Sequence, residues 1–286
     1  MSRNNKDRVG VSDLHTGAEA PPTPPQHQSS SPLTFVAPTE FVELPSGGRY
    51  YDEGHPLHNQ DVIEIKHMTT KEEDILTSQA LLKQGKALDR FLQQVIVDSR
   101  IDADRLLVGD KNAILVAARK TGYGAEYETS IPCPACGSVV EHEFDLDNFT
   151  ILGEEAPEGA SRIGNDTFLI ENLPTTKWSV EVKLLTSADE RSVLDSVTAR
   201  RKRGLPDDTL ATQMSAFIVS IEGVTDRSQI NQAVAILPAK DARYLRDVYK
   251  KLIPNIDLKQ VFVCSECDYS GDMEVPFTTD FFWPKQ

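Results

Sequence analysis

Short stretches of alternating apolar and polar residues begin after an initial polar segment. Residues 41–44 and 49–51 are strand-like and flank the sequence Pro-Ser-Gly-Gly at positions 45–48. Proline and glycine favour a tight turn here, so the pattern predicts a hairpin. Residues 61–65 alternate again and predict a third strand.

Helical periodicity follows these strands. Thr69 precedes Glu72 by three residues, which is the spacing of a capping box and predicts a helix start. Apolar residues then recur at helical spacing on one face at Leu88, Leu92, Val95 and Ile96. Asp110 is predicted to cap a further helix, which Gly122 and Gly124 end.

The second half of the chain returns to strands and then to helices. From Tyr127 the pattern is extended, and residues 153–166 are turn-rich and acidic. A strand pair is predicted at 167–170 and 178–185, followed by helices at 187–203, 207–221 and 239–252. Residues 261–263 predict a last strand before an apolar end.

Composition separates an N-terminal arm from the rest of the chain. Residues 1–34 are rich in proline, glutamine and serine, and their first 33 positions hold no Phe, Trp or Tyr. Such a segment buries too little apolar area to offset its ordering entropy, so we expect a disordered arm. The whole chain has 286 residues and a net charge of −14, with no apolar run long enough for a membrane span. The start lacks a secretory signal pattern, and a reducing intracellular setting is expected.

All four cysteines of the chain fall into two Cys-x-x-Cys motifs, Cys133/Cys136 and Cys264/Cys267. Each motif lies between strand-like segments, and a glycine follows each, at Gly137 and Gly271. Two such turns supply the four thiolates of a tetrahedral zinc site. The pattern predicts one structural zinc ion.

Other cysteine chemistry is less well supported by the flanking residues. A redox pair needs an activated thiolate, typically at a helix N-terminus, whereas residues 136–140 look like a hairpin. Iron bound by four thiolates is the chemical alternative to zinc. His142 is close to the first motif and is interpreted as a strand residue and not as a fifth ligand.

The two motifs are unusually far apart. Zinc ribbons commonly have about 15–20 residues between their pairs, whereas positions 136 and 264 enclose about 127 residues. We therefore predict an α+β fold with small antiparallel strands, a discontinuous four-cysteine zinc ribbon and two helical regions, one inserted between the ribbon halves. The expected parts are a disordered arm (1–34), a hairpin, helices and the first cysteine pair (35–149), an inserted strand pair and helical domain (150–258), and the second cysteine pair with an aromatic end (259–286).

No catalytic motif is present in the sequence. The chain has no phosphate-binding glycine loop, no dinucleotide fingerprint, and no His-Glu-x-x-His or Gly-x-Ser-x-Gly sequence. His55 and His58 flank Pro56-Leu57 in a predicted loop and are not expected to bind metal. Four protein thiolates leave no open position for water on zinc. The sequence therefore favours a protein that is not an enzyme.

Several segments resemble the T4-type bacteriophage baseplate protein family. They are residues 43–51 (ELPSGGRYY), 64–76 (EIKHMTTKEEDIL), 122–127 (GYGAEY), 184–190 (LLTSADE) and 280–284 (DFFWP). The resemblance covers most of residues 40–286 and leaves out the N-terminal arm. It implies a baseplate hub subunit or hub assembly protein of a contractile tail, located in the host cytoplasm during assembly or in the virion. The implied partners are other tail and baseplate proteins, without a small-molecule substrate or a membrane.

Two further questions stay open at the level of sequence. Phe281, Phe282 and Trp283 are candidates for a partner-binding anchor, since aromatic residues dominate interface hot spots. The alternative is that they fold back onto the ribbon. A zinc-ribbon nucleic-acid-binding accessory of viral transcription or replication is the second functional hypothesis. Acidic residues around both cysteine pairs, such as Glu141 and Asp272, disfavour contact with phosphates.

Overall fold

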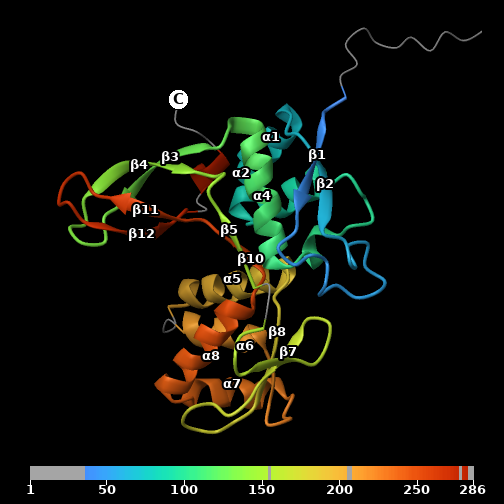
Figure 1. The fold of residues 1–286 in the computed structure, drawn as a ribbon, viewed down its shortest axis with the longest axis vertical. Coiled ribbons are helices and arrows are strands. Elements are labelled where there is room, and N and C mark those ends of the chain that lie inside the picture. The colour runs from blue at the N-terminus through green and yellow to red at the C-terminus, as the bar shows by residue number, and fades with distance from the viewer. Residues whose placement is uncertain (1–35, 154–155, 205–207, 277–278, 283–286) are drawn as a thin grey trace, which may run out of the picture. The chain divides into compact units, whose positions relative to one another are not determined.

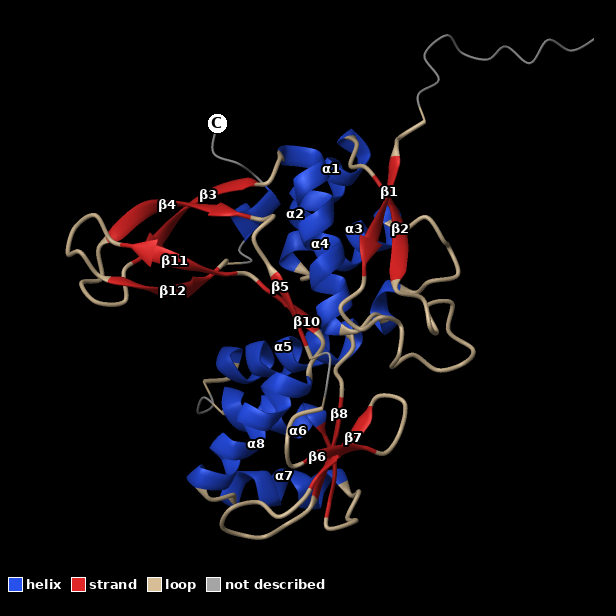
Figure 2. Ribbon diagram, in the orientation of Figure 1, coloured by secondary structure: helices blue, strands red, loops and turns tan. Residues whose placement is uncertain are grey.

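The computed structural model describes residues 36–153, 156–204, 208–276 and 279–282. The predicted arm at 1–34 and Trp283 lie outside these residues. Residues 37–286 belong to one compact unit, and its described elements are eight α-helices and small antiparallel sheets. The predicted α+β class with small antiparallel sheets is confirmed. Figure 1 and Figure 2 show the arrangement of these elements.

The first part of this unit combines a two-stranded sheet with helices. Its elements are β1 (Thr39–Glu43), β2 (Val62–Lys66), α1 (Thr70–Thr77), α2 (Gln79–Lys83), α3 (Ala87–Val95), the 3-10 helix η1 (Ala103–Arg105) and α4 (Val108–Tyr123). The predicted capping box of Thr69 and Glu72 is present at the start of α1. Phe91, Leu92 and Val95 of α3 are fully buried, so this helix supplies much of the local core.

The predicted hairpin of 41–44 with 49–51 is wrong. β1 pairs with β2 instead, and residues 44–61 form a long loop. The loop is bound to α4 because Ser46 donates to the Asp110 carboxylate through its N–H and its hydroxyl, at 2.9 and 2.6 Å. Tyr51 donates a third hydrogen bond at 2.7 Å. Asp110 is therefore not the helix cap that we predicted but a buried anchor for this loop, in the first turn of a helix that starts at Val108.

Two β-hairpins carry the cysteine motifs. β3 (Glu126–Pro132) pairs with β4 (Val139–Asp145), and β11 (Lys259–Val263) pairs with β12 (Ser270–Glu274). The hairpins lie side by side in Figure 1, although more than a hundred residues separate them in the sequence. Burial alternates along β3, which has one face on the core and one in solvent.

A strand pair connects the two ends of the segment that lies between the hairpins in the sequence. β5 (Thr150–Leu152) pairs with β10 (Asn255–Asp257) in antiparallel fashion, so the two ends of the inserted segment are adjacent. The insert contains a four-stranded sheet of order β6 (Ala160–Arg162), β7 (Thr167–Ile170), β8 (Val180–Lys183) and β9 (Ile218–Ile221). Its helices are α5 (Ser187–Lys202), α6 (Thr209–Phe217), α7 (Arg227–Ile236) and α8 (Ala239–Leu252).

Three details of the insert differ from the sequence prediction. The helix predicted at 207–221 ends at Phe217, and the following residues form β9 because Val180 and Val182 of β8 pair with them. Helix α7 was missed, since among its residues only Ile230 and Val234 are buried and its apolar stripe is short. The turn-rich segment 153–166 contains strand β6, which pairs with β7. Of the described helices, none is long and apolar enough to span a membrane.

Candidate metal centre

The two cysteine motifs meet at the tips of the two hairpins. Cys133 follows β3 directly, and Cys264 follows β11 directly. The Sγ atoms of Cys133, Cys136, Cys264 and Cys267 all lie within 4.8 Å of one another. Cys133 and Cys264 are buried, whereas Cys136 and Cys267 are exposed. The convergence that the sequence predicted is therefore present in the tertiary structure.

The distances between sulfur atoms fit a four-thiolate metal site. Cys133 Sγ lies 3.7 Å from Cys267 Sγ, and Cys136 Sγ lies 3.8 Å from Cys264 Sγ. A tetrahedral zinc ion with bonds of about 2.3 Å requires sulfur separations of about 3.8 Å. All four cysteines are free of disulfide bonds. The donor set and its spacing are suited to zinc, and four thiolates also suit iron.

Backbone geometry explains how each tip presents two sulfurs to one point. Cys133 N–H donates to Ser138 O at 2.9 Å, and Cys264 N–H donates to Tyr269 O at 2.8 Å. The residue after each motif has a positive φ, 75° at Gly137 and 56° at Asp268. Gly271, the glycine that follows the second motif in the sequence, lies within β12, and Asp268 adopts the left-handed conformation in its place. Aspartate tolerates this conformation better than most residues. The sequence did not indicate that Asp268 would adopt it.

Hydrogen-bonding groups around the sulfurs act differently on the individual thiols. Ala135 N–H points at Cys133 Sγ and Glu266 N–H points at Cys264 Sγ, each at 3.4 Å. The pKa of Cys136 is lowered to about 6, first by a hydrogen bond from the Ser138 hydroxyl and then by one from its backbone N–H. The Tyr269 backbone hydrogen bond lowers the pKa of Cys267, but the neighbouring cysteine sulfurs and burial outweigh it and raise this pKa to about 12. A lowered thiol pKa increases the fraction of thiolate, which is the form that binds metal.

Aromatic packing supports the two hairpins beneath the cysteines. The His142 ring contacts Phe144 at 4.6 Å and Phe262 at 5.2 Å between ring centroids, both edge-on. Phe144 and Phe262 are fully buried. Gln260 adds two hydrogen bonds to the Asp145 backbone, at 3.0 and 2.6 Å. His142 therefore joins β4 to β11 by packing and does not belong to the sulfur cluster.

The outer face of β3–β4 is strongly acidic. The register places Glu126 opposite Asp145 and Glu128 opposite Glu143, and all four residues are exposed. Like charges directly opposite one another on a sheet are destabilising. This face would also repel phosphates, which disfavours the hypothesis of a nucleic-acid-binding ribbon.

The other residues that the sequence singled out hold the fold together. His55 accepts a hydrogen bond from Leu57 N–H and stacks on Tyr51, and His58 donates to Tyr51 O at 2.7 Å. Both histidines therefore stabilise the loop at 44–61 through contacts within it.

Phe281 and Phe282 lie in the core, with exposures of 1% and 3%. Phe282 packs on Phe91 of α3, and Phe281 packs on Tyr127 of β3. These two rings are thus covered by the chain itself, as in the fold-back alternative, although helix α3 shares the contact with strand β3. Trp283 lies outside the described residues.

Arg119 is a residue whose role the sequence did not indicate. It is 1% exposed, and its guanidinium donates to Phe281 O at 2.7 Å, Gly124 O at 2.8 Å and Glu126 O at 3.2 Å. Burial lowers the pKa of Arg119. A lone arginine in a helical pattern gives no signal of this role, because its partners are backbone carbonyls outside the helix, two just after its end and one far away at Phe281.

The fold and the site together define an α+β protein in which a four-cysteine cluster joins two hairpins that are distant in sequence. Residues 37–283 match the family described as T4 bacteriophage base plate protein. The chain belongs to this family, and the resemblance noted in the sequence is confirmed. No curated protein and no solved structure matches the chain.

Proposed function

We propose that this chain is a non-enzymatic structural or assembly protein of the baseplate hub in a contractile phage tail. The observation that carries the proposal is the family match over residues 37–283. Its partners are other tail and baseplate proteins. It acts in the host cytoplasm during assembly, either as a part of the finished tail baseplate or as an assembly factor that leaves it.

We further propose that the four cysteines bind one structural zinc ion and so form a discontinuous zinc ribbon. Cys133, Cys136, Cys264 and Cys267 would fill a tetrahedral coordination shell and leave no position for a substrate or a reactive water. When bound, the metal supplies a cross-link between the two hairpins. The sulfur spacings of 3.7 and 3.8 Å support this assignment.

A structural cross-link suits a protein that holds neighbours together. The β5–β10 pair already brings together the ends of the insert, and the cysteine cluster joins the same two chain segments a second time beyond it. Closing so long a loop removes much conformational freedom from the unfolded chain. The result would be a defined relative position for the two hairpins.

Removal of the gene from the phage tests the proposed role. We expect infected cells to accumulate free tail fibres and baseplate components but few complete tails, as seen by electron microscopy and by sedimentation of lysates. Wild-type protein supplied from a plasmid should restore tails, and this is the control for polar effects on neighbouring genes. Normal numbers of infectious tails without the gene would refute the role.

A further inference from the structure

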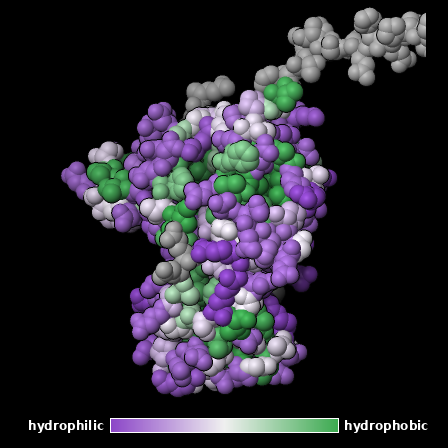
Figure 3. All heavy atoms as spheres, turned by 45° about the vertical axis from the view of Figure 1, so that its right-hand side comes forward, coloured by the Kyte–Doolittle hydropathy of each residue, from purple (hydrophilic) through white to green (hydrophobic). Residues whose placement is uncertain are grey.

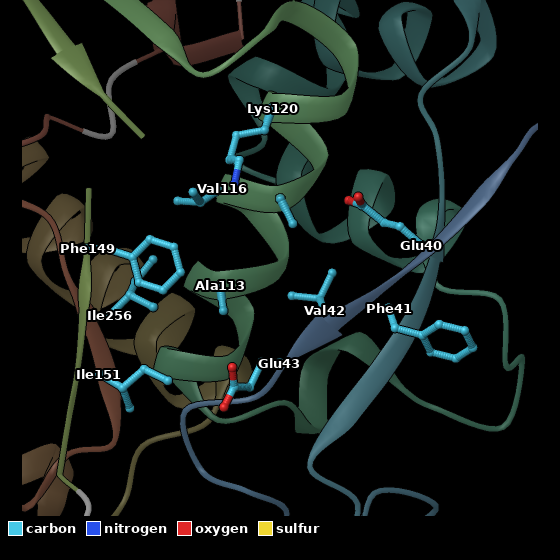
Figure 4. A pocket seen from close by; sticks show the side chains of 11 residues that line it. Glu40, Phe41, Val42, Glu43, Ala113, Val116, Lys120, Phe149, Ile151 and Ile256 are labelled. Atoms are coloured by element: carbon cyan, nitrogen blue, oxygen red, sulfur yellow. The ribbon is translucent and has the colours of Figure 1, made fainter. Parts of the chain in front are cut away.

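A groove lies beside the open edge of strand β1. Its floor is formed by Ala113, Val116 and Ala117 of α4, and its volume is about 200 Å³. One wall is β1, and Ile151 and Ile256 form the other. These two isoleucines are direct cross-strand partners in the β5–β10 pair, so they present one apolar surface to the groove. Figure 4 shows the side chains around it.

The edge of β1 that borders this groove is paired with no other strand in the described part of the chain. Among the described residues, β1 pairs with β2 only. Leu44 N–H donates to Asp61 O, and His67 N–H donates to Pro38 O. Antiparallel strands alternate their bonding direction, so the even-numbered residues of β1 face β2. The N–H and C=O groups of Thr39, Phe41 and Glu43 therefore point to the open edge.

The side chains of β1 divide between the two faces of the strand. Val42 is buried against the groove, and Figure 4 shows Glu40 on the same side, with its carboxylate directed toward α4. Phe41 points to the other side and is 70% exposed. Figure 3 shows apolar surface gathered near the start of β1. An unpaired strand edge with an exposed aromatic ring is a template for another strand.

The charge of the groove identifies the kind of strand that fits. Oε1 of Glu40 is buried and has no hydrogen-bond donor in the part of the chain that the structure describes. Glu43 also lines the groove. Lys120, the one cation among the described residues that line it, forms an ion pair with Asp147 and also attracts the Glu40 carboxylate, as His67 does. A buried acceptor without a donor is costly. The groove therefore calls for a hydrogen-bond donor, and its two acidic lining residues, Glu40 and Glu43, favour a positively charged one.

We propose that β1 is an interaction edge that takes up an extended strand from a neighbouring tail protein. That strand carries a lysine or arginine opposite Glu40 and apolar residues over Val42 and Phe41. Backbone hydrogen bonds to residues 39, 41 and 43 would give affinity, and the two faces would give specificity. A second copy of this chain is a poor occupant, because its net charge of −14 opposes the acidic groove. The inference deepens the proposed function and rests on it.

Hydrogen exchange at single-amide resolution tests this inference. Tagged full-length chain is purified from phage-infected cells as a complex with tail proteins and compared with free chain at equal concentration. We expect the amides of Thr39, Phe41 and Glu43 to exchange at least about tenfold more slowly in the complex. The amides of Glu40 and Val42 face β2 and should be protected in both samples. Equal exchange of the odd-numbered amides in both samples would overturn the inference.

Matched variants separate the backbone edge from the side chains. Phe41→Pro removes an outward N–H without removing a bond to β2, and it should reduce the yield of the complex at least about tenfold. Phe41→Thr retains the N–H and should reduce it less. Glu40→Lys should also reduce complex formation, whereas Glu128→Lys on exposed β3 should not. Circular dichroism of each free variant verifies that it folds, and a Phe41→Pro chain that folds and still forms complexes at the wild-type yield would overturn the inference.

Other occupants give different results. If protection is already present in free chain and disappears when residues 1–35 are deleted, the edge is covered by the chain's own N-terminal segment and the inference is wrong. If protection rises with the concentration of free chain, the occupant is a second copy and the inference is also wrong. If tails require the chain but the edge of β1 is not protected in the complex, the proposed function stands and the inference about β1 fails. If tails assemble without the chain, the proposed function and the inference are both refuted.

Discussion

The four cysteines occupy two kinds of environment although their motifs are alike. Cys133 and Cys264 are 2% and 1% exposed and follow strands β3 and β11 directly. Cys136 and Cys267 are exposed and precede the residues with positive φ. Each turn thus contributes one buried thiol and one exposed thiol. Loss of any one thiol leaves an incomplete tetrahedral set.

We expect Cys264→Ser to remove the metal. Zinc content should fall from about one ion per chain to near zero, because a serine hydroxyl is a poor zinc ligand at neutral pH. The melting temperature should fall with it, since metal binding is coupled to folding. Mass spectrometry with a plasma source measures the metal, and Ser265→Ala in the same turn is the control. A Cys264→Ser chain that still carries one equivalent would contradict the four-thiolate assignment.

Arg119 connects the backbone just after helix α4 to the backbone of Phe281 from one buried side chain. Its guanidinium donates to carbonyl groups at Gly124, Glu126 and Phe281. We expect Arg119→Met to lower the free energy of unfolding by about 3 kcal/mol, because three carbonyls lose a charged donor. Urea denaturation followed by circular dichroism measures the change.

The matched control for Arg119 is Arg243→Met. The Arg243 side chain is 81% exposed and forms a 3.7 Å ion pair with Asp247 on the same helix. Exposed pairs of this kind contribute about 0.5 kcal/mol or less. Equal losses for the two variants would show that the buried contacts of Arg119 do not stabilise the fold.

At the scale of elements, acidic residues in first helical turns serve two purposes. Glu72 caps its own helix through Thr69, as the sequence predicted. Asp110 and Asp241 are also in first turns and fully buried, but they bind distant loops. Asp241 accepts hydrogen bonds from Thr175 N–H at 2.7 Å and from Thr176 N–H and Oγ1 at 2.8 Å each. One sequence signal therefore has two structural outcomes, and only the tertiary partners distinguish them.

The contact between helix α4 and the start of β10 depends on Gly109. A Cβ at this position would lie 1.8 Å from Pro254 O, so the helix or the strand would have to move. We expect Gly109→Ala to lower the free energy of unfolding by about 1–3 kcal/mol, although alanine is the better helix former. Chemical denaturation measures this.

Gly54→Ala is the control for Gly109, because a Cβ there meets no atom within 4 Å. It should change the free energy of unfolding by no more than about 0.5 kcal/mol. A neutral Gly109→Ala variant would show that the packing of α4 on β10 tolerates displacement.

At the scale of the whole unit, the insert is held by strand pairing, by further backbone hydrogen bonds and by ion pairs. Ser187 N–H at the start of α5 donates to Leu106 O at 2.8 Å, and Val108 N–H donates to Leu185 O at 3.0 Å. Arg191 of α5 forms ion pairs with Asp89 and Asp104. These contacts do not involve the cysteine cluster. The proposed metal would therefore matter for the hairpins more than for the attachment of the insert.

We expect a zinc chelator to loosen the two hairpins selectively. Hydrogen exchange should increase in residues 126–145 and 259–274 because their tips lose the cross-link. Exchange in β7 and β8 should change little, since this sheet has its own buried residues, such as Phe168 and Val182. Added zinc should reverse the effect. Uniform unfolding, or no change in the hairpins, would contradict this division of roles.

The sequence by itself determined the α+β class, the four cysteines as one group, the capping box at Thr69 and the family. These depend on local spacing, on composition or on motifs that the residues carry directly. Tertiary structure alone decided that β1 pairs with β2, that Asp110 anchors a loop, and that residues 218–221 form a strand. It also decided the burial of Arg119 and Phe281. Each of these outcomes depends on a partner far away in the sequence, and local periodicity contains no information about that partner.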